Sequence, residues 1–276
     1  MMSIEQEVVR HWTHGSLEEA IRNGLIASGH SLDSLQPDDL APVDEFHMGG
    51  REATVHLAEK IELKPDMTVL DVGSGIGGPA RFFASHYGCR VVGIDVTPEY
   101  VDVAESLTAM VGFAGQVAFK TASATALPFD AEGFDAAMLI HVAMNIADKQ
   151  ALCAEVARVL KPRGAFAVYE VMRTSDGDLS YPVPWAETAD LSFLATPTTF
   201  RKALERSGFT VVAEENRRDF ALDFFRRIRT RMLESGPPPL GIHLHMGSAA
   251  PEKIANMIDN MERGLIAPVE MICRRT

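Results

Sequence analysis

The stretch that most constrains the fold of this chain is Val-Leu-Asp-Val-Gly-Ser-Gly-Ile-Gly-Gly-Pro, residues 69–79. The apolar run at residues 67–72 predicts a buried strand, and Pro79 predicts the start of a helix because proline suits the first helical position. Glycines between a strand and a helix let the backbone turn tightly and approach a ligand closely, while the free N–H groups of the helix start attract a negative group. The stretch therefore predicts a ligand-binding turn in an α/β fold.

Two acidic residues narrow the choice of ligand. Asp71 lies two residues before Gly73, at the strand end, where its carboxylate can accept hydrogen bonds from an ammonium group. Dinucleotide-binding turns use a similar glycine pattern but usually have no acid there. Asp95 ends the next apolar run, residues 91–95, where a ribose diol would lie. Asp71 thus favours a cofactor that carries an amino acid, whereas Asp95 serves this cofactor and a dinucleotide equally.

Further motifs follow in order: Ala-Leu-Pro-Phe at 126–129, Gly-Phe-Asp at 133–135 and Leu-Lys-Pro-Arg-Gly at 160–164, the last two each before a predicted strand. This set resembles the class I S-adenosylmethionine-dependent methyltransferases over residues 44–212. Residues 46–54, Phe-His-Met-Gly-Gly-Arg-Glu-Ala-Thr, are similar to the segment F-x-x-G-G-x-x-A-T of the small-molecule branch, which includes the sarcosine/dimethylglycine, phosphoethanolamine and tocopherol methyltransferases. The resemblance implies S-adenosyl-L-methionine as cofactor and a small-molecule metabolite as substrate, methylated at N, O or C.

Composition excludes several partners. The formal net charge of −12 opposes binding to phosphate backbones, so we expect no nucleic acid partner. No window approaches the roughly 20 apolar residues of a membrane span, and the acidic start is unlike a signal peptide, so we expect no membrane partner. The widely spaced Cys89, Cys153 and Cys273 predict reduced, buried thiols and a cytoplasmic location.

Apolar periodicity and turn residues divide the chain into four parts. Residues 1–43 predict an N-terminal helical cap, 44–216 the cofactor-binding core, 217–264 a helical insertion, and 265–276 a final strand, mostly after Pro268. Together they predict a doubly wound, Rossmann-like sheet of seven strands. The insertion either covers the cleft or joins two subunits of a homodimer. Most of its arginines are expected to be solvated, with one or two able to meet an anionic substrate: Arg217, Arg218, Arg226, Arg227, Arg229 and Arg231.

The resemblance implies that the loop at residues 44–50 closes over the methionine portion of the cofactor. Relatives usually carry an Asp at the position of Ser123, and that Asp binds the adenine amino group. Here the serine oxygen can still accept a hydrogen bond, so that recognition of the adenine is weakened, or shared with the Ala124 N–H, without being lost; alternatively, Ser123 is only a loop residue, and both interpretations stay open. The predicted cofactor-binding residues are Met48, Gly49, Asp71, Gly73, Ser74, Gly75, Asp95, Val96, Ser123, Ala124 and His141.

The catalytic candidates follow the strand predicted at residues 134–140. His141 aligns with a cofactor-contacting position in relatives, and Asn145 with a histidine that helps place the substrate in the phosphoethanolamine enzymes. A structural role for His141 is equally open, and His14 and His47 are the other histidines expected near the methyl group. His243 and His245 have the spacing of metal ligands, but no nearby cysteine or carboxylate cluster completes a site, so we expect no metal.

Residues 181–185, Tyr-Pro-Val-Pro-Trp, are predicted to line the substrate side of the cleft. With Trp12 and Phe46, the aromatic side chains Tyr181 and Trp185 offer a cation–π cage for a quaternary amine. Two alternatives to a methyltransferase remain. A sensor that binds the cofactor without turnover would explain Ser123, and an NAD(P)-dependent oxidoreductase is disfavoured by Asp71 and by the motifs after residue 126.

Overall fold

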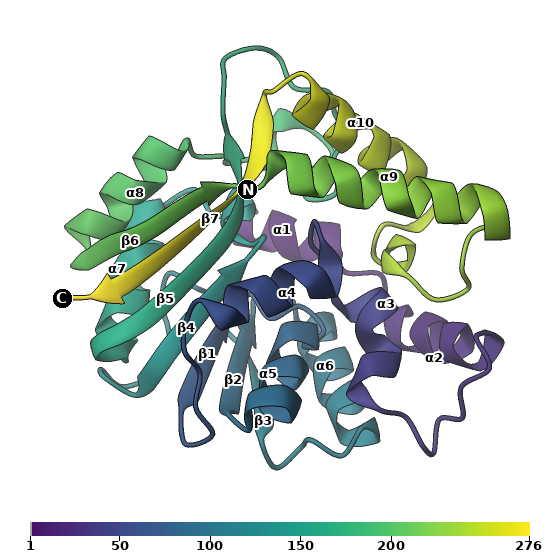
Figure 1. Cartoon of the computed structure of the whole chain (residues 1–276), viewed down its shortest axis with the longest axis horizontal. Helices are drawn as coiled ribbons and strands as arrows, with labels where there is room; N and C mark the ends of the chain where they lie inside the picture. The colour runs from purple at the N-terminus through teal and green to yellow at the C-terminus, as the bar shows by residue number, and fades with distance from the viewer. Residues whose placement is uncertain (1) are drawn as a thin grey trace.

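A computed structural model describes residues 2–276 and contains one sheet in the order β3-β2-β1-β4-β5-β7-β6 (Figure 1). Neighbouring strands from β3 to β5 pair in parallel, whereas β7 runs antiparallel to both β5 and β6. The seven-stranded sheet that the sequence predicted is therefore confirmed. Its strands are β1 Thr68–Val72, β2 Arg90–Asp95, β3 Val117–Thr121, β4 Phe134–Ile140, β5 Leu160–Arg173, β6 Phe209–Asn216 and β7 Ile266–Arg275.

Helices cover both faces of the sheet because its central strands are apolar on both sides. On one face, Val69 of β1 packs with side chains of α4 Gly50–Glu59, α5 Gly78–Tyr87 and α6 Pro98–Met110. On the other face, the neighbouring Leu70 packs with side chains of α7 Lys149–Val159 and α8 Pro197–Arg206. Consecutive residues of β1 thus point to opposite faces of the sheet. The sheet therefore forms the middle layer between two layers of helices.

The last strand differs from the prediction at its start. β7 begins at Ile266, and its pairing with β5 continues across Pro268, which lies opposite Val171. β6 pairs with β7 only from Val269 onward, so Pro268 lies where one side of β7 has no neighbouring strand. Proline is tolerated at such an edge because the missing N–H is not needed there. The strand therefore begins at Ile266, earlier than predicted, although most of it lies after Pro268 as expected.

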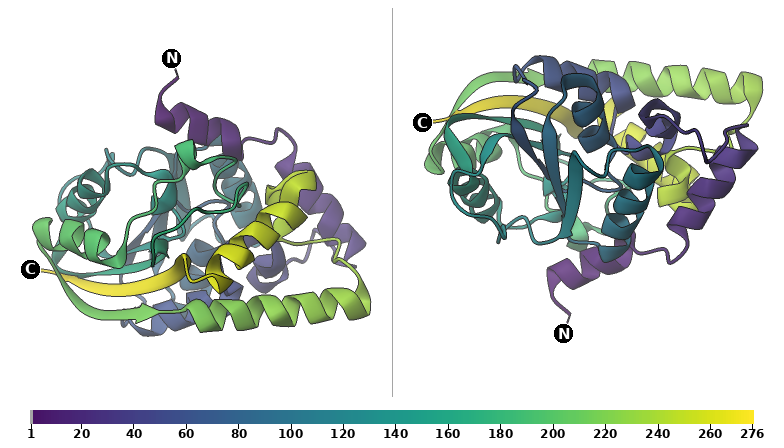
Figure 2. Two further views of the ribbon diagram at one scale, coloured as in Figure 1. Left: turned by 90° about the horizontal axis from the view of Figure 1, so that it is seen from above. Right: turned by 90° about the horizontal axis from the view of Figure 1, so that it is seen from below.

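The N-terminal segments and the insertion gather at one end of the sheet (Figure 2). Leu17, Ile21 and Leu25 of one N-terminal helix share a core with Leu107 of α6, so this helix is part of the main body. Among residues 2–276, no helix is long and apolar enough to cross a membrane. The elements of the two segments are α1 Ile4–Trp12, α2 Leu17–Ala27, η1 Pro37–Leu40, α3 Ala41–Asp44, α9 Arg218–Ser235, η4 Ile242–His245, η5 Gly247–Ala249 and α10 Ala250–Glu262.

Candidate active site

A cavity with an empty volume of about 1450 Å³, including its mouth open to solvent, lies at the carboxyl ends of the parallel strands. This edge is where open α/β sheets bind ligands, since loops from neighbouring strands meet there. The catalytic candidate Asn145 lines the cavity, and so do all predicted cofactor-binding residues except Gly49: Met48, Asp71, Gly73, Ser74, Gly75, Asp95, Val96, Ser123, Ala124 and His141.

Gly49 faces a helix of the insertion. A Cβ atom at this position would lie 2.4 Å from Cε1 of Phe220, and the residue has a φ of +94°. A glycine is thus required for close packing of the loop against α9 and for a left-handed backbone. The structure does not bring Gly49 to the cavity.

The glycine turn after β1 combines close packing with open space. A Cβ at Gly73 would lie 2.3 Å from Cγ2 of Val142, so this glycine lets the exit of β4 approach the turn. A Cβ at Gly75 would meet no atom within 4 Å, although Gly75 lines the cavity. The Gly75 N–H donates to Oδ2 of Asp95 over 3.0 Å, and the Thr97 N–H donates to Oδ1 over 2.9 Å. Asp95 therefore holds the turn in place, and each of its oxygens retains a lone pair.

Three buried polar atoms that face no protein partner belong to residues lining this end of the cavity. They are Oδ2 of Asp71, Oγ of Ser74 and Oδ1 of Asp44. Burial, together with the nearby carboxylates of Asp95 and Glu45, raises the pKa of Asp71 to about 8. Unpaired buried acceptors cost free energy, and a ligand that brings donors removes this cost. The site is therefore suited to an ammonium group.

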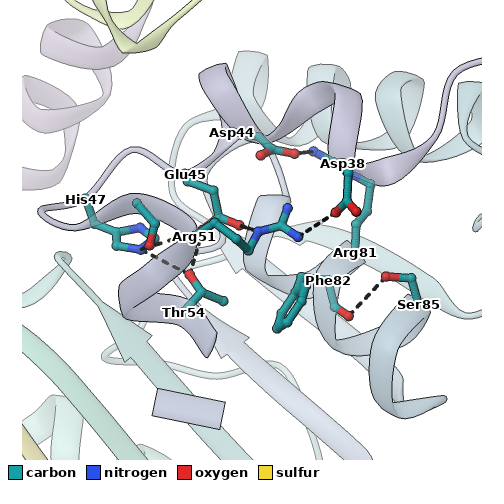
Figure 3. Close-up of polar contacts among 10 residues, drawn as sticks. Asp38, Asp44, Glu45, His47, Arg51, Thr54, Arg81, Phe82 and Ser85 are labelled. Atoms are coloured by element: carbon teal, nitrogen blue, oxygen red, sulfur yellow. Dashed lines mark hydrogen bonds and ion pairs between the residues drawn. The ribbon is translucent and has the colours of Figure 1, made fainter. Parts of the chain in front are cut away.

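Ion pairs hold the loop at residues 44–50 in place (Figure 3). Four residues of this loop line the cavity: Asp44, Phe46, His47 and Met48. The Arg81 guanidinium donates to the Asp44 carboxylate over 2.8 Å, with both side chains almost fully buried. Glu45 accepts from Arg51 and, over 2.6 Å, from the Thr54 hydroxyl. Removing one partner of such a pair would leave an uncompensated buried charge, which costs about 3–5 kcal/mol. The loop is thus held by electrostatics as well as by its glycines.

Both ring nitrogens of His141 are engaged by the protein. Nδ1 lies 3.0 Å from the Tyr169 carbonyl oxygen and must donate to it, so Nε2 accepts from the Met48 N–H at 3.4 Å. The Tyr169 hydroxyl donates to the Met48 carbonyl over 2.9 Å. Burial and the adjacent His47 lower the pKa of His141 to about 3. His141 is therefore neutral and, together with Tyr169, clamps the backbone of Met48.

Asn145 connects two segments that cover the cavity. Its Nδ2 donates to the Trp185 carbonyl over 2.9 Å and to the Leu191 carbonyl over 3.2 Å. Its Oδ1 accepts from Nε1 of Trp12 at 3.4 Å. The side chain thus joins α1 to the loop that carries Trp185, and its amide donors are both in use.

Sequence reasoning missed two buried residues of the cavity wall, Tyr100 and His245. Nε2 of His245 donates to the Val43 carbonyl over 2.8 Å, so Nδ1 accepts from the Tyr100 hydroxyl at 3.1 Å. Phe46 stacks on the His245 ring with centroids 4.7 Å apart. Both nitrogens of His245 are thus in use. Tyr100 lies in the first turn of α6, shortly after Asp95 at the end of β2, and this position is the sequence signal that could have placed it near the site.

The predicted aromatic cage is formed in part. Trp12 and Phe46 lie edge to face with centroids 5.6 Å apart, and Trp185 also lines the cavity. Tyr181, in contrast, is not part of the lining and packs in a core cluster with residues of the insertion. His14 is likewise outside the lining, whereas His47 belongs to it.

The sheet order and the helices on both faces define a class I methyltransferase fold, with the cavity at the carboxyl ends of its parallel strands. Residues 70–168 match the model of a family described as "Methyltransferase domain". Residues 70–168 are therefore similar to the methyltransferase domain family, which confirms the predicted resemblance. The three cysteines are buried free thiols, as predicted.

The curated relatives act on different molecules. Sterol 24-C-methyltransferase of Yarrowia lipolytica is 33% identical over 180 residues, which is 60% of this chain and 46% of the relative. Glycine/sarcosine/dimethylglycine N-methyltransferase of Actinopolyspora halophila is 25% identical over 194 residues, 70% of this chain and 34% of the relative. The chain spans about half or less of the length of these relatives.

Solved structures show the same fold at low sequence identity. A putative sarcosine dimethylglycine methyltransferase from Galdieria sulphuraria superimposes with a TM-score of 0.68 at 20% identity, covering 82% of this chain and 86% of that one. Geranyl diphosphate C-methyltransferase from Streptomyces coelicolor superimposes with a TM-score of 0.73 at 16% identity, covering 100% and 99%. The second superposition extends over the whole chain and therefore includes the N-terminal helices and the insertion before β7.

Proposed function

We propose that the chain transfers a methyl group from S-adenosyl-L-methionine to a small-molecule metabolite at N, O or C. The observation that carries this proposal is the group of unpartnered buried acceptors on Asp71, Ser74 and Asp44 beside the open space at Gly75. A cofactor with a free amino group satisfies these acceptors, whereas a dinucleotide has no ammonium to offer them. The match of residues 70–168 to the methyltransferase domain family supports the same assignment.

When bound, the cofactor supplies a methyl group already activated on a sulfonium, so the protein needs to orient the reactants and exclude water. In this proposal, Asp71, Ser74 and Asp44 accept from the cofactor's ammonium group, and Asp95 accepts from the ribose hydroxyls while it holds Gly75. The side of the cavity with Val96, Ser123 and Ala124 receives the adenine.

His141 and Asn145 act in this proposal as positioning residues. The ring nitrogens of His141 are both engaged, so His141 holds Met48 and does not move a proton. Asn145 holds Trp12 and the Trp185 loop together over the reacting groups. The aromatic and apolar side chains around them exclude water from the cavity.

We also propose the four-part organisation of residues 1–43, 44–216, 217–264 and 265–276, with the insertion as a cover. Phe225, Ile254 and Met257 of the insertion line the cavity. This position supports a role of the insertion as a cover of the cavity rather than as a subunit interface. The buried free thiols support a cytoplasmic location.

Two measurements test the proposed function. Isothermal titration should show binding of S-adenosylhomocysteine and none of NAD; the reverse result would identify a dehydrogenase. Release of S-adenosylhomocysteine from S-adenosyl-L-methionine in the presence of a metabolite panel should depend on one class of acceptor. Tight cofactor binding without turnover on any acceptor would instead identify a sensor.

A further inference from the structure

We infer from the wall of the cavity that the substrate is an uncharged, largely apolar molecule. This inference rests on the proposed function, since it assigns to the substrate the part of the cavity left by the cofactor-binding residues. Most of the cofactor-binding residues gather around the glycine turn and the ends of β2 and β3, while Met48 and His141 lie at the border with the rest of the cavity. The remaining wall is built mainly by α1, the exit of β4, the Trp185 loop and the insertion.

The remaining wall is composed mostly of methionine, aromatic and aliphatic side chains from segments far apart in the sequence. Methionine side chains are flexible and polarizable, so they adapt to an irregular apolar ligand, and aromatic rings supply broad contact surfaces. The apolar residues of this part are Val8, Trp12, Phe46, Met144, Pro184, Trp185, Phe225, Ile242, Met246, Ile254 and Met257.

No lysine or arginine occurs among the described residues that line the cavity. Three arginines of the insertion have partners elsewhere. Arg227 pairs with Glu52 at 2.8 Å, Arg218 donates to the Met261 carbonyl over 2.6 Å, and Arg217 lies over the Phe220 ring. An anionic substrate would therefore be buried without a cationic partner, which is strongly unfavourable. The expectation that one or two of these arginines meet an anionic substrate is not supported.

A cationic or strongly polar substrate would find the rings of Trp12, Phe46 and Trp185 in this part of the cavity, but no carboxylate to pair with. The carboxylates that line the cavity belong to Glu5 and to Asp44, Asp71 and Asp95, which lie with the cofactor-binding residues. Two polar side chains in the apolar wall already make hydrogen bonds to other protein groups. Asn145 uses both of its amide N–H donors, and His245 uses both ring nitrogens. The Tyr100 hydroxyl donates to His245 and keeps a lone pair that can accept from one neutral hydroxyl of a ligand.

The experiment uses the full chain saturated with S-adenosylhomocysteine and the neutral fluorescent probe N-phenyl-1-naphthylamine. Competing ligands are decanol, decylamine and decyl phosphate, which share one hydrocarbon chain and differ in charge. We expect saturable probe binding, with displacement by decanol at a concentration at least about tenfold lower than by either charged analogue, because burial of an unpaired charge is costly.

Two variants locate the binding. Met257→Lys places a cation in the apolar wall and should weaken probe binding at least about tenfold. The probe must either bury the lysine charge or compete with the lysine side chain for the space of the cavity. Leu233→Lys, at a position of α9 that is 82% exposed, is the matched control and should leave binding unchanged. If Met257→Lys fails to fold, as judged by circular dichroism, Met144→Gln on another part of the wall tests the same point.

The two proposals fail in distinguishable ways. Absence of S-adenosylhomocysteine binding contradicts the proposed function. If S-adenosylhomocysteine binds normally, two results overturn the inference. Decylamine or decyl phosphate displaces the probe at concentrations as low as decanol does, or the probe does not bind. Probe binding that is insensitive to the wall variants overturns it as well.

Discussion

The Ser123 hydroxyl donates a hydrogen bond to the carboxylate of Glu5, which lies 118 residues earlier in the chain. Glu5, Val8 and Trp12 occupy one face of α1 at helical spacing, and all three line the cavity. The resemblance to class I methyltransferases implies that most relatives carry an Asp at the position of Ser123. In this chain, α1 brings a carboxylate to the same place from another element.

We therefore expect Glu5 to contribute to adenine binding. Glu5→Ala should weaken the affinity for S-adenosylhomocysteine by roughly three- to tenfold, the range for losing one partly exposed hydrogen bond. Glu7→Ala, on the same helix but outside the cavity lining, is the matched control. Isothermal titration measures both variants, and equal affinities would show that Glu5 has no part in the site.

Deletion of residues 2–13 should reduce turnover more than cofactor affinity. These residues contribute Val8 and Trp12 to the apolar wall but few residues to the core. A longer deletion to residue 40 would also remove Leu17, Ile21 and Leu25 from a core shared with α6 and would destabilise the fold. Steady-state kinetics and titration with S-adenosylhomocysteine compare the two effects. Full activity of the short deletion would exclude a role for α1.

Gly75→Val should abolish cofactor binding with little change in fold, because the side chain would enter the space beside the unpartnered acceptors. Gly75 has a φ of +53°, so any side chain adds backbone strain of about 1 kcal/mol. Gly112→Val is the matched control, with a φ of +80°, no atom within 4 Å of an added Cβ and a position outside the cavity lining. Thermal melts and titration should show similar destabilisation but loss of binding only at Gly75. Normal binding by Gly75→Val would place the cofactor elsewhere.

Asp95→Ala should weaken binding of S-adenosylhomocysteine by about 1.5–3 kcal/mol, or about 10- to 150-fold, through loss of charge-assisted hydrogen bonds. Part of this cost comes from the released turn, since Asp95 also accepts from the Gly75 N–H. Asp95→Asn keeps one acceptor oxygen and should lose less affinity. Unchanged affinity in a folded Asp95→Ala protein would refute the ribose assignment.

The affinity for S-adenosylhomocysteine should rise with pH between pH 6 and pH 8. The pKa of Asp71 in the free protein is about 8, so the carboxyl is largely protonated at pH 6 and must lose its proton to pair with an ammonium. Affinity should therefore increase by up to about tenfold from pH 6 to pH 7. Titrations at each pH check this, and Asp71→Asn should remove the dependence. A flat profile in the native protein would exclude Asp71 as the ammonium partner.

The same pKa shift has the opposite effect on the stability of the free protein. Asp71 has a higher pKa in the folded state than the ordinary value of 3.8, so the folded state binds more protons between these values. The stability that this group contributes is fully present below pH 3.8 and is lost as pH rises from there to about 8. Melting temperatures with and without S-adenosylhomocysteine should therefore diverge as pH rises.

The sequence by itself determined the order of strands and helices and the position of the glycine turn. These features depend on local properties: apolar runs predict buried strands, proline marks helix starts, and a glycine turn follows a strand. The Asp71 and Asp95 carboxylates were also predictable, because their positions at strand ends are set by the strands that carry them. The Asp148 side chain caps α7 for the same local reason.

Only the tertiary structure decided which residues close the cavity and which candidates are already engaged. The pairs Glu5–Ser123, Trp12–Asn145 and Tyr100–His245 join residues 118, 133 and 145 positions apart. Sequence spacing does not constrain such contacts, because they arise when several helices pack on the sheet at once. Likewise, a loop glycine such as Gly49 suits a ligand and a packed ring equally well by conformation. The role of Gly49 depends on the side chain that packs against it from another element. Here this side chain is Phe220, which the packing of α9 places against Gly49.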